Sequence, residues 1–312
     1  MASRVSDLIS EVTRQRELPS AIDSATFDEV LSAPATNVSM KAQLQLVSRE
    51  GAGAWLHASP DREKDTILEG ELFRTAMKRR LRVTFLERPG FCPMCGSGMD
   101  VFMDHARVCS CEDDRTLRHN AIRNLVNMIA AVAGLRPETE KPGLLPPRPE
   151  DECWRGEGVR NGRRPADIWV PHWHSGAPAA WDFAVTSGLR TDSLFAPSED
   201  RDQATSAYEA FKRDHMNTDA RCRTRGLEFM PLVAEAHGGS WGLVAKSVWK
   251  SLSKAWDAVT GSDESAAAAE LQQRISVTLQ RENARAVLKR LAPTAEVAPE
   301  ACPDAWLDND DL

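Results

Sequence analysis

Three cysteines and one histidine lie in one short segment with the spacing of metal ligands. Cys92 and Cys95 are separated by two residues, and His105 and Cys109 by three. Thiolate and imidazole groups are the ligands that Zn²⁺ prefers, and these short spacings allow four of them to converge in a tetrahedron. Four protein ligands close the site, so we expect a structural zinc rather than a catalytic one. Cys111 is an alternative to Cys109 as the fourth ligand.

Two aspartates further along the chain lie in segments that read as strands. Asp167 stands in Arg-Pro-Ala-Asp-Ile-Trp-Val, and Asp182 stands in Ala-Ala-Trp-Asp-Phe-Ala-Val-Thr. Carboxylates on neighbouring strands can hold Mg²⁺ or Mn²⁺, which prefer oxygen ligands and assist phosphodiester hydrolysis. Either aspartate alone could be a solvated residue at the end of a strand. Their combination with the upstream Cys/His segment favours a second metal site.

The elements that position these residues are predicted by the apolar periodicity. A helix, two strands, a helix and a third strand follow one another, which predicts a compact α/β unit. Its elements are expected over about 115–135, 167–170, 180–186, 203–216 and 227–236. Further helices are expected over 6–31 (interrupted at Pro19), 40–50, 65–81 and 240–259 and from about 262, with an extended proline-rich stretch over 137–149.

Charge and cysteine usage bound the class of protein. The formal net charge of −7 argues against a nucleic-acid-binding protein, but the basic residues form local clusters, which is what phosphate binding needs. The same clusters could be solvated helix faces. Seven cysteines, three of them beside a histidine, suit metal binding in a reducing compartment. With no run of eighteen apolar residues and no apolar signal segment, we expect a nuclear or cytoplasmic protein without a membrane partner.

Taken in order, these motifs resemble the C-terminal region of site-specific non-LTR retrotransposon proteins. The resemblance rests on the Cys-Cys-His-Cys set, on the Arg-His-Asn that begins at Arg118, and on Asp167 and Asp182, and it spans about residues 50–290. In that family a CCHC zinc knuckle precedes a restriction-like endonuclease of the PD-(D/E)xK class, and cellular relatives of these elements carry similar sequences. No reverse-transcriptase core precedes the matching region here, so we expect no copying of RNA.

The resemblance implies an α/β fold with a restriction-endonuclease-like core, a small CCHC zinc knuckle and flanking helices. Two departures from the family pattern concern the core. Ala166 separates the proline from Asp167, and Ala184 stands where the general nuclease pattern has a lysine. In the retrotransposon relatives that lysine can come from the following helix, where Lys212 is the matching residue here.

The expected site residues fall into three groups. Asp167, Asp182, Lys212 and Glu140 are expected to act in catalysis, with the two aspartates holding Mg²⁺ or Mn²⁺. Arg118, His119, Arg163 and Arg164 are expected to contact nucleic acid, which is DNA or, as an alternative, RNA. Cys92, Cys95, His105 and Cys109 are expected to hold the zinc.

These expectations divide the chain and rank its functions. The expected parts are a helical region over 1–85, the zinc knuckle over 86–117, the endonuclease core over 118–245, C-terminal helices over 246–295 and an acidic disordered tail over 296–312. The first hypothesis is a divalent-metal-dependent endonuclease that nicks DNA. The second is a nucleic-acid-binding protein of the same fold that has lost cleavage, and the third is a zinc-stabilised adaptor that recruits a partner.

Overall fold

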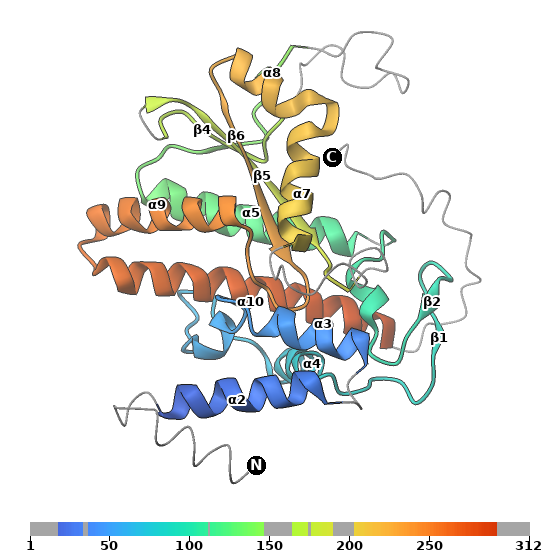
Figure 1. Ribbon diagram of the computed structural model, residues 1–312. Coiled ribbons are helices and arrows are strands. Elements are labelled where there is room, and N and C mark those ends of the chain that lie inside the picture. The colour runs from blue at the N-terminus through green and yellow to red at the C-terminus, as the bar shows by residue number, and fades with distance from the viewer. Residues whose placement is uncertain are drawn as a thin grey trace.

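A computed structural model describes most of the chain as a mixed α/β structure. The described residues are 18–33, 37–111, 113–146, 164–173, 176–189 and 203–291. Arg163 and the acidic segment 296–312 lie outside them. Helices surround a four-stranded mixed sheet, and a two-stranded hairpin with the Cys/His segment lies at one side (Figure 1). Within the described part, no helix is both long and apolar enough to cross a membrane.

The sheet has the strand order β3-β4-β5-β6. Its strands are β3 (Glu138–Thr139), β4 (Ile168–Val170), β5 (Ala179–Thr186) and β6 (Glu228–Glu235). The first three strands run antiparallel, whereas β6 is parallel to β5. A parallel neighbour needs a crossover connection, and the connection here contains α7 (Gln203–Asp214) and α8 (Thr218–Thr224). The predicted order of helix, strands, helix and strand is therefore confirmed.

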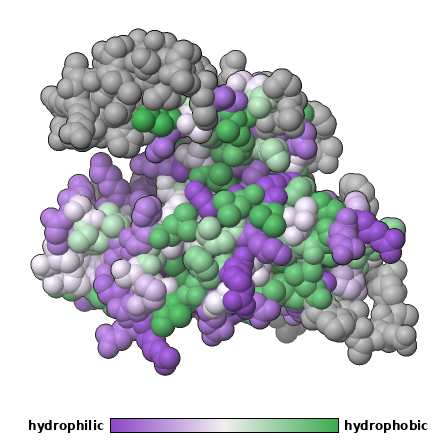
Figure 2. Space-filling view, turned by 90° about the horizontal axis from the view of Figure 1, so that it is seen from below, coloured by the Kyte–Doolittle hydropathy of each residue, from purple (hydrophilic) through white to green (hydrophobic). Residues whose placement is uncertain are grey.

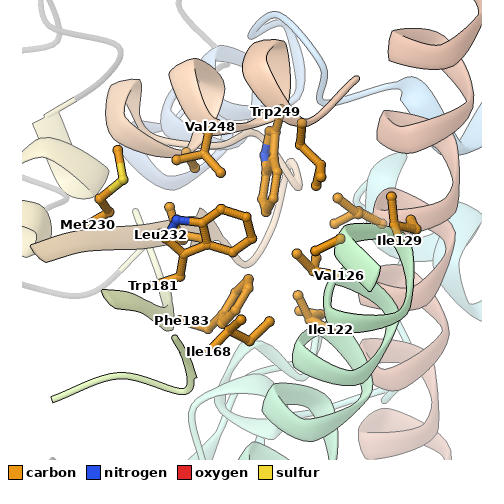
Figure 3. Close-up of a cluster of buried hydrophobic side chains, with 14 of the residues drawn as sticks. Ile122, Val126, Ile129, Ile168, Trp181, Phe183, Met230, Leu232, Val248 and Trp249 are labelled. Atoms are coloured by element: carbon orange, nitrogen blue, oxygen red, sulfur yellow. The ribbon is translucent and has the colours of Figure 1, made fainter. Parts of the chain in front are cut away.

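One face of the sheet is covered by three helices, which enclose the main core. They are α5 (Asp114–Val132), α9 (Leu243–Thr260) and α10 (Glu264–Leu291). Trp181 of β5 and Leu232 of β6 are fully buried, and Figure 3 shows them in one cluster with Trp249 of α9 and the apolar side of α5. Alternate strand residues point the other way, where Ala180 and Phe229 pack with Cys222 of α8. The central strands are thus buried on both faces.

The N-terminal helices form a further layer beneath α10 (Figure 1). They are α2 (Leu18–Ser32), α3 (Val38–Val47), the 3₁₀ turn η2 (Ala54–His57) and α4 (Gly70–Arg80). Trp55 of η2 and Ala76 of α4 pack with Val277 of α10. Figure 2 views the molecule from this side and shows apolar patches interleaved with hydrophilic residues.

One boundary in this layer differs from the predicted one. The helix expected over 65–81 begins only at Gly70. Asp65 has a left-handed backbone (φ 54°), and Arg281 donates hydrogen bonds to the carbonyl oxygens of Asp65 and Ile67, so this stretch cannot continue the helix. The helix expected over 6–31 with an interruption at Pro19 is described only from Leu18 onward, as α2, and its earlier part lies outside the described residues.

Candidate metal centre and acid pair

The Cys/His segment folds into a hairpin followed by a short turn of 3₁₀ helix. The hairpin pairs β1 (Gly90–Phe91) with β2 (Gly98–Met99), and Cys92 donates its N–H to Ser97 O at 2.8 Å. Gly96 has φ +72°, a conformation that favours glycine, and it turns the chain back toward Cys92. The turn η3 (Asp104–Arg107) carries His105, whose carbonyl oxygen accepts the N–H of Cys109. Local folding thus brings the two halves of the motif together.

The four expected zinc ligands converge. The ligand atoms of Cys92, Cys95, His105 and Cys109 all lie within 4.8 Å of one another. Cys95 Sγ is 3.0 Å from His105 Nε2, and Cys92 Sγ is 4.0 Å from Cys109 Sγ. Tetrahedral Zn²⁺ with bonds of about 2.0–2.3 Å needs ligand atoms roughly 3.5–3.8 Å apart, so the set fits. The cluster could hold a metal ion such as zinc, and Cys111 does not belong to it.

The electrostatic surroundings of the cluster favour thiolates at two of the three cysteines. Burial opposes ionisation of Cys109, but hydrogen bonding from Arg290 and a backbone N–H outweighs it and lowers the pKa of that thiol. The pKa of Cys95 is also lowered, because hydrogen bonds from Ser97 outweigh burial. Burial raises the pKa of Cys92. A dication would supply the attraction that Cys92 needs to ionise.

Arg118 joins the Cys/His segment to the helices, which corrects its expected role. We expected this arginine to contact nucleic acid, but it is only 4 % exposed. Its guanidinium donates to the carbonyl oxygen of Arg107 at 3.0 Å and to Asn283 Oδ1 of α10 at 2.8 Å. Burial lowers its pKa to about 10. Arg118 therefore links η3, α5 and α10 and has no surface to offer a ligand.

The two aspartates lie close together, with Asp182 on β5 and Asp167 immediately before β4. β4 and β5 pair with Ile168 opposite Trp181. Asp167 N–H also donates to Trp181 O at 2.9 Å, so the pairing shifts by one residue at this position. The N–H of Phe183, the residue after Asp182, donates to Asp167 Oδ2 at 2.6 Å, and the Asp167 carboxylate contributes to a raised pKa of Asp182. The start of β4 and the middle of β5 thus bring the two acids together.

Asp182 is a largely buried carboxylate beside the ammonium group of Lys212. Its side chain is 18 % exposed, and Lys212 Nζ of α7 lies 3.3 Å from Asp182 Oδ2. Burial raises its pKa to about 6; Asp167 adds to this rise, whereas Lys212 opposes it. Crowding of two carboxylates in a poorly solvated place is the physical cause. A divalent cation would relieve the same repulsion, since oxygen ligands on two acids suit Mg²⁺ or Mn²⁺.

Asp167 is held by two donors, one on each carboxylate oxygen. The N–H of Phe183 donates to Oδ2 at 2.6 Å, and His119 Nε2 of α5 lies 3.1 Å from Oδ1. His119 was expected to contact nucleic acid. In the structure its ring, with 27 % of the side chain exposed, lies against Asp167 and edge-on to Phe183. The histidine therefore belongs to the surroundings of the acid pair.

Glu140 is close to the acid pair through its backbone, while its side chain is engaged elsewhere. Its N–H donates to Asp167 O at 3.0 Å. The carboxylate is paired with Arg123 of α5 and, at 3.2 Å, with Arg164. Arg164 has 56 % of its side chain exposed and remains at the surface, where a phosphate could reach it. To act as a third catalytic acid, Glu140 would first have to break its ion pairs with Arg123 and Arg164.

Two features of the site were not predicted. The backbone N–H of Phe183 carries no sequence signal, because any non-proline residue provides one. The position of Arg123 could have been inferred from the sequence, because Arg123 follows His119 by one helical turn and therefore lies on the same face of α5.

Comparison with models of known protein families finds no family that matches this chain, and no curated protein sequence matches it.

Proposed function

We propose that this chain is a divalent-metal-dependent endonuclease that nicks DNA, with a restriction-endonuclease-like core and a structural zinc. The observation that carries the proposal is the cluster formed by Asp167 just before β4, Asp182 on β5 and Lys212 on α7. This is the arrangement that the resemblance to retrotransposon endonucleases implies, including a lysine supplied from a helix in place of Ala184.

The donor set suits the chemistry. Mg²⁺ is commonly held by one or two protein carboxylates together with substrate phosphate oxygens. Here the two aspartates would supply the protein ligands. When bound, the cation would lower the pKa of a water molecule and neutralise charge on the phosphate. Asp167 and Asp182 would hold it, and the ammonium group of Lys212 would orient the attacking water or stabilise developing charge. The zinc would have a structural role, because all four of its ligands come from the protein.

Cationic groups near the acid pair could bind the DNA backbone. Arg164 lies at the surface next to Glu140, whereas Lys141 is only partly exposed, where it pairs with Glu138 and lies 3.3 Å from the ring centre of Trp169. Phosphate contacts of this kind are independent of sequence and sensitive to salt. RNA offers the same backbone charge, so a matched RNA substrate belongs in the same assay.

Nicking of supercoiled plasmid by zinc-loaded protein tests the proposal. With Mg²⁺ or Mn²⁺ the wild type is expected to nick, and Asp167→Ala and Asp182→Ala are expected to abolish nicking. Glu63→Ala, which removes an exposed acid far from the aspartates in sequence, is the control and should nick like the wild type. Equal nicking by all four proteins would refute the proposed site.

The second candidate is a nucleic-acid-binding protein that has lost cleavage. The observation that favours it is Ala184, which leaves Asp182 without the lysine that the general nuclease pattern places two residues later. It predicts DNA binding that weakens steeply with salt and no metal-dependent product. Binding without nicking, for the wild type in both Mg²⁺ and Mn²⁺, would select this candidate.

A further inference from the structure

His119 makes a directional contact with the acid pair. Its Nε2 is 3.1 Å from Asp167 Oδ1, and the ring is fixed edge-on against Phe183, with the ring centres 6.4 Å apart. An ionised carboxylate can only accept hydrogen bonds, so Nε2 carries the proton in this contact. The contact is therefore a directional hydrogen bond with Nε2 as its donor, whereas a simple electrostatic attraction between the two side chains would require no particular donor atom.

The two donors together fix the plane of the Asp167 carboxylate. Phe183 N–H holds Oδ2 and His119 holds Oδ1, so rotation of the carboxylate would break one of the two hydrogen bonds. Each oxygen keeps a second lone pair, because a carboxylate offers about four acceptor sites. These free lone pairs are the ones available to a cation shared with Asp182 on the adjacent strand.

The histidine itself is anchored from outside the sheet. It follows Arg118, whose guanidinium is buried between Arg107 of the Cys/His segment and Asn283 of α10. The start of α5 is thereby fixed relative to both the Cys/His segment and α10. As an exposed ion pair, the contact between His119 and Asp167 would contribute only about 0–1 kcal/mol to stability. Such a small contribution gives little reason for the buried hydrogen bonds of Arg118 that hold His119 in place.

We propose that His119 is a positioning residue for the divalent cation: its Nε2–H orients the Asp167 carboxylate so that Asp167 and Asp182 present lone pairs to the same ion. The inference rests on the proposed function in placing a divalent cation at the acid pair. Hydrogen bonds to metal-ligating groups usually govern metal affinity or activity by about 10- to 100-fold.

Three substitutions of His119 distinguish the effect of its Nε2–H donor from the effect of the rest of the imidazole ring. Glutamine places an amide N–H near the position of Nε2, whereas asparagine places it near Nδ1, and alanine has no donor. Glutamine and asparagine both lose the ring contact with Phe183, so the difference between them reports the donor position alone. His57→Ala, which removes an exposed histidine of η2, is the control.

Two readouts are measured on zinc-loaded protein: the affinity for Mn²⁺ by calorimetry, and the Mn²⁺ concentration that gives half-maximal plasmid nicking. We expect His119→Ala and His119→Asn to weaken both by about 10- to 100-fold and His119→Gln to stay close to the wild type. Thermal melting of each variant, expected to match the wild type, shows that the fold is retained.

Failure of this inference differs from failure of the proposed function. Wild-type affinity in His119→Ala, or an equal loss in the glutamine and alanine variants, overturns the positioning role even if the protein nicks DNA. A wild type that binds Mn²⁺ but does not nick overturns the proposed function, and the Mn²⁺ affinities of the three variants still decide the role of His119. A wild type that binds no Mn²⁺ overturns both.

Discussion

Replacing Asp182 by asparagine is expected to make the metal-free protein more stable at alkaline pH. The folded protein raises the pKa of Asp182 from 3.8 to about 6, chiefly by burial. An acid with a raised pKa binds its proton more tightly when folded, so its ionised form opposes folding. This penalty is fully present above pH 6, decreases as the pH falls and vanishes below the unfolded pKa. Asparagine is neutral at every pH and removes the penalty.

The magnitude follows from the two pKa values. A pKa raised from 3.8 to about 6 corresponds to about 3 kcal/mol at pH 8. With the same two values, linkage gives about 1.6 kcal/mol at pH 5 and about 0.6 kcal/mol at pH 4. The attraction of Lys212, which favours the ionised form, is already contained in the pKa of about 6. Asp182→Asn should therefore exceed the wild type in stability by these amounts.

Urea denaturation at pH 8, 5 and 4 measures the difference. The buffers must be free of divalent cations other than the zinc already bound and must contain no chelator. Glu63→Gln, an exposed acid, reports the effect of removing a negative charge at the surface. A variant that is less stable than the wild type at pH 8, or a difference that does not shrink toward pH 4, would refute the reasoning.

Three further predictions concern the structure around the site. Removing zinc with a chelator should lower the melting temperature, because a closed metal site couples binding to folding, and superimposable melting curves would contradict the zinc assignment. Arg118→Met should cost about 2 kcal/mol or more in urea denaturation, because it leaves Arg107 O and Asn283 Oδ1 buried without their donor; a loss under about 0.5 kcal/mol would show that the buried link is dispensable. Ile275→Ala, at a fully buried position of α10, should cost about 2–5 kcal/mol in the same experiment, and a smaller loss would mean that the core around it collapses into the cavity.

The sequence predicted those parts of the structure that depend on local spacing. The Cys-x2-Cys and His-x3-Cys pattern identified the four residues whose ligand atoms converge, because a hairpin and one helical turn suffice to join them. Strands β4, β5 and β6 were predicted from short runs of β-branched and aromatic residues, and helices α5, α9 and α10 from apolar periodicity. In each of these cases the pattern that forms the element is contained within it.

Contacts between distant segments could not be predicted in the same way. Arg118 reads as a surface base, and only the packing of α10 against α5 brings Asn283 to it and buries it. The contact of His119 with Asp167 depends on the placement of α5 over the sheet. Likewise, the raised pKa of Asp182 depends on its burial and on the nearby carboxylate of Asp167. These are properties of the assembled fold, which spacing along the chain does not encode.

The most direct test of the proposed nuclease uses Asp182→Asn, because two opposite effects are expected of this one variant. Its single-turnover rate of plasmid nicking in Mg²⁺ at pH 8 is measured beside its free energy of unfolding in Mg²⁺-free buffer. A metal-dependent nuclease site predicts that the variant is more stable than the wild type and does not nick. Nicking at the wild-type rate by the stabilised variant would contradict the assignment of Asp182 to the catalytic site.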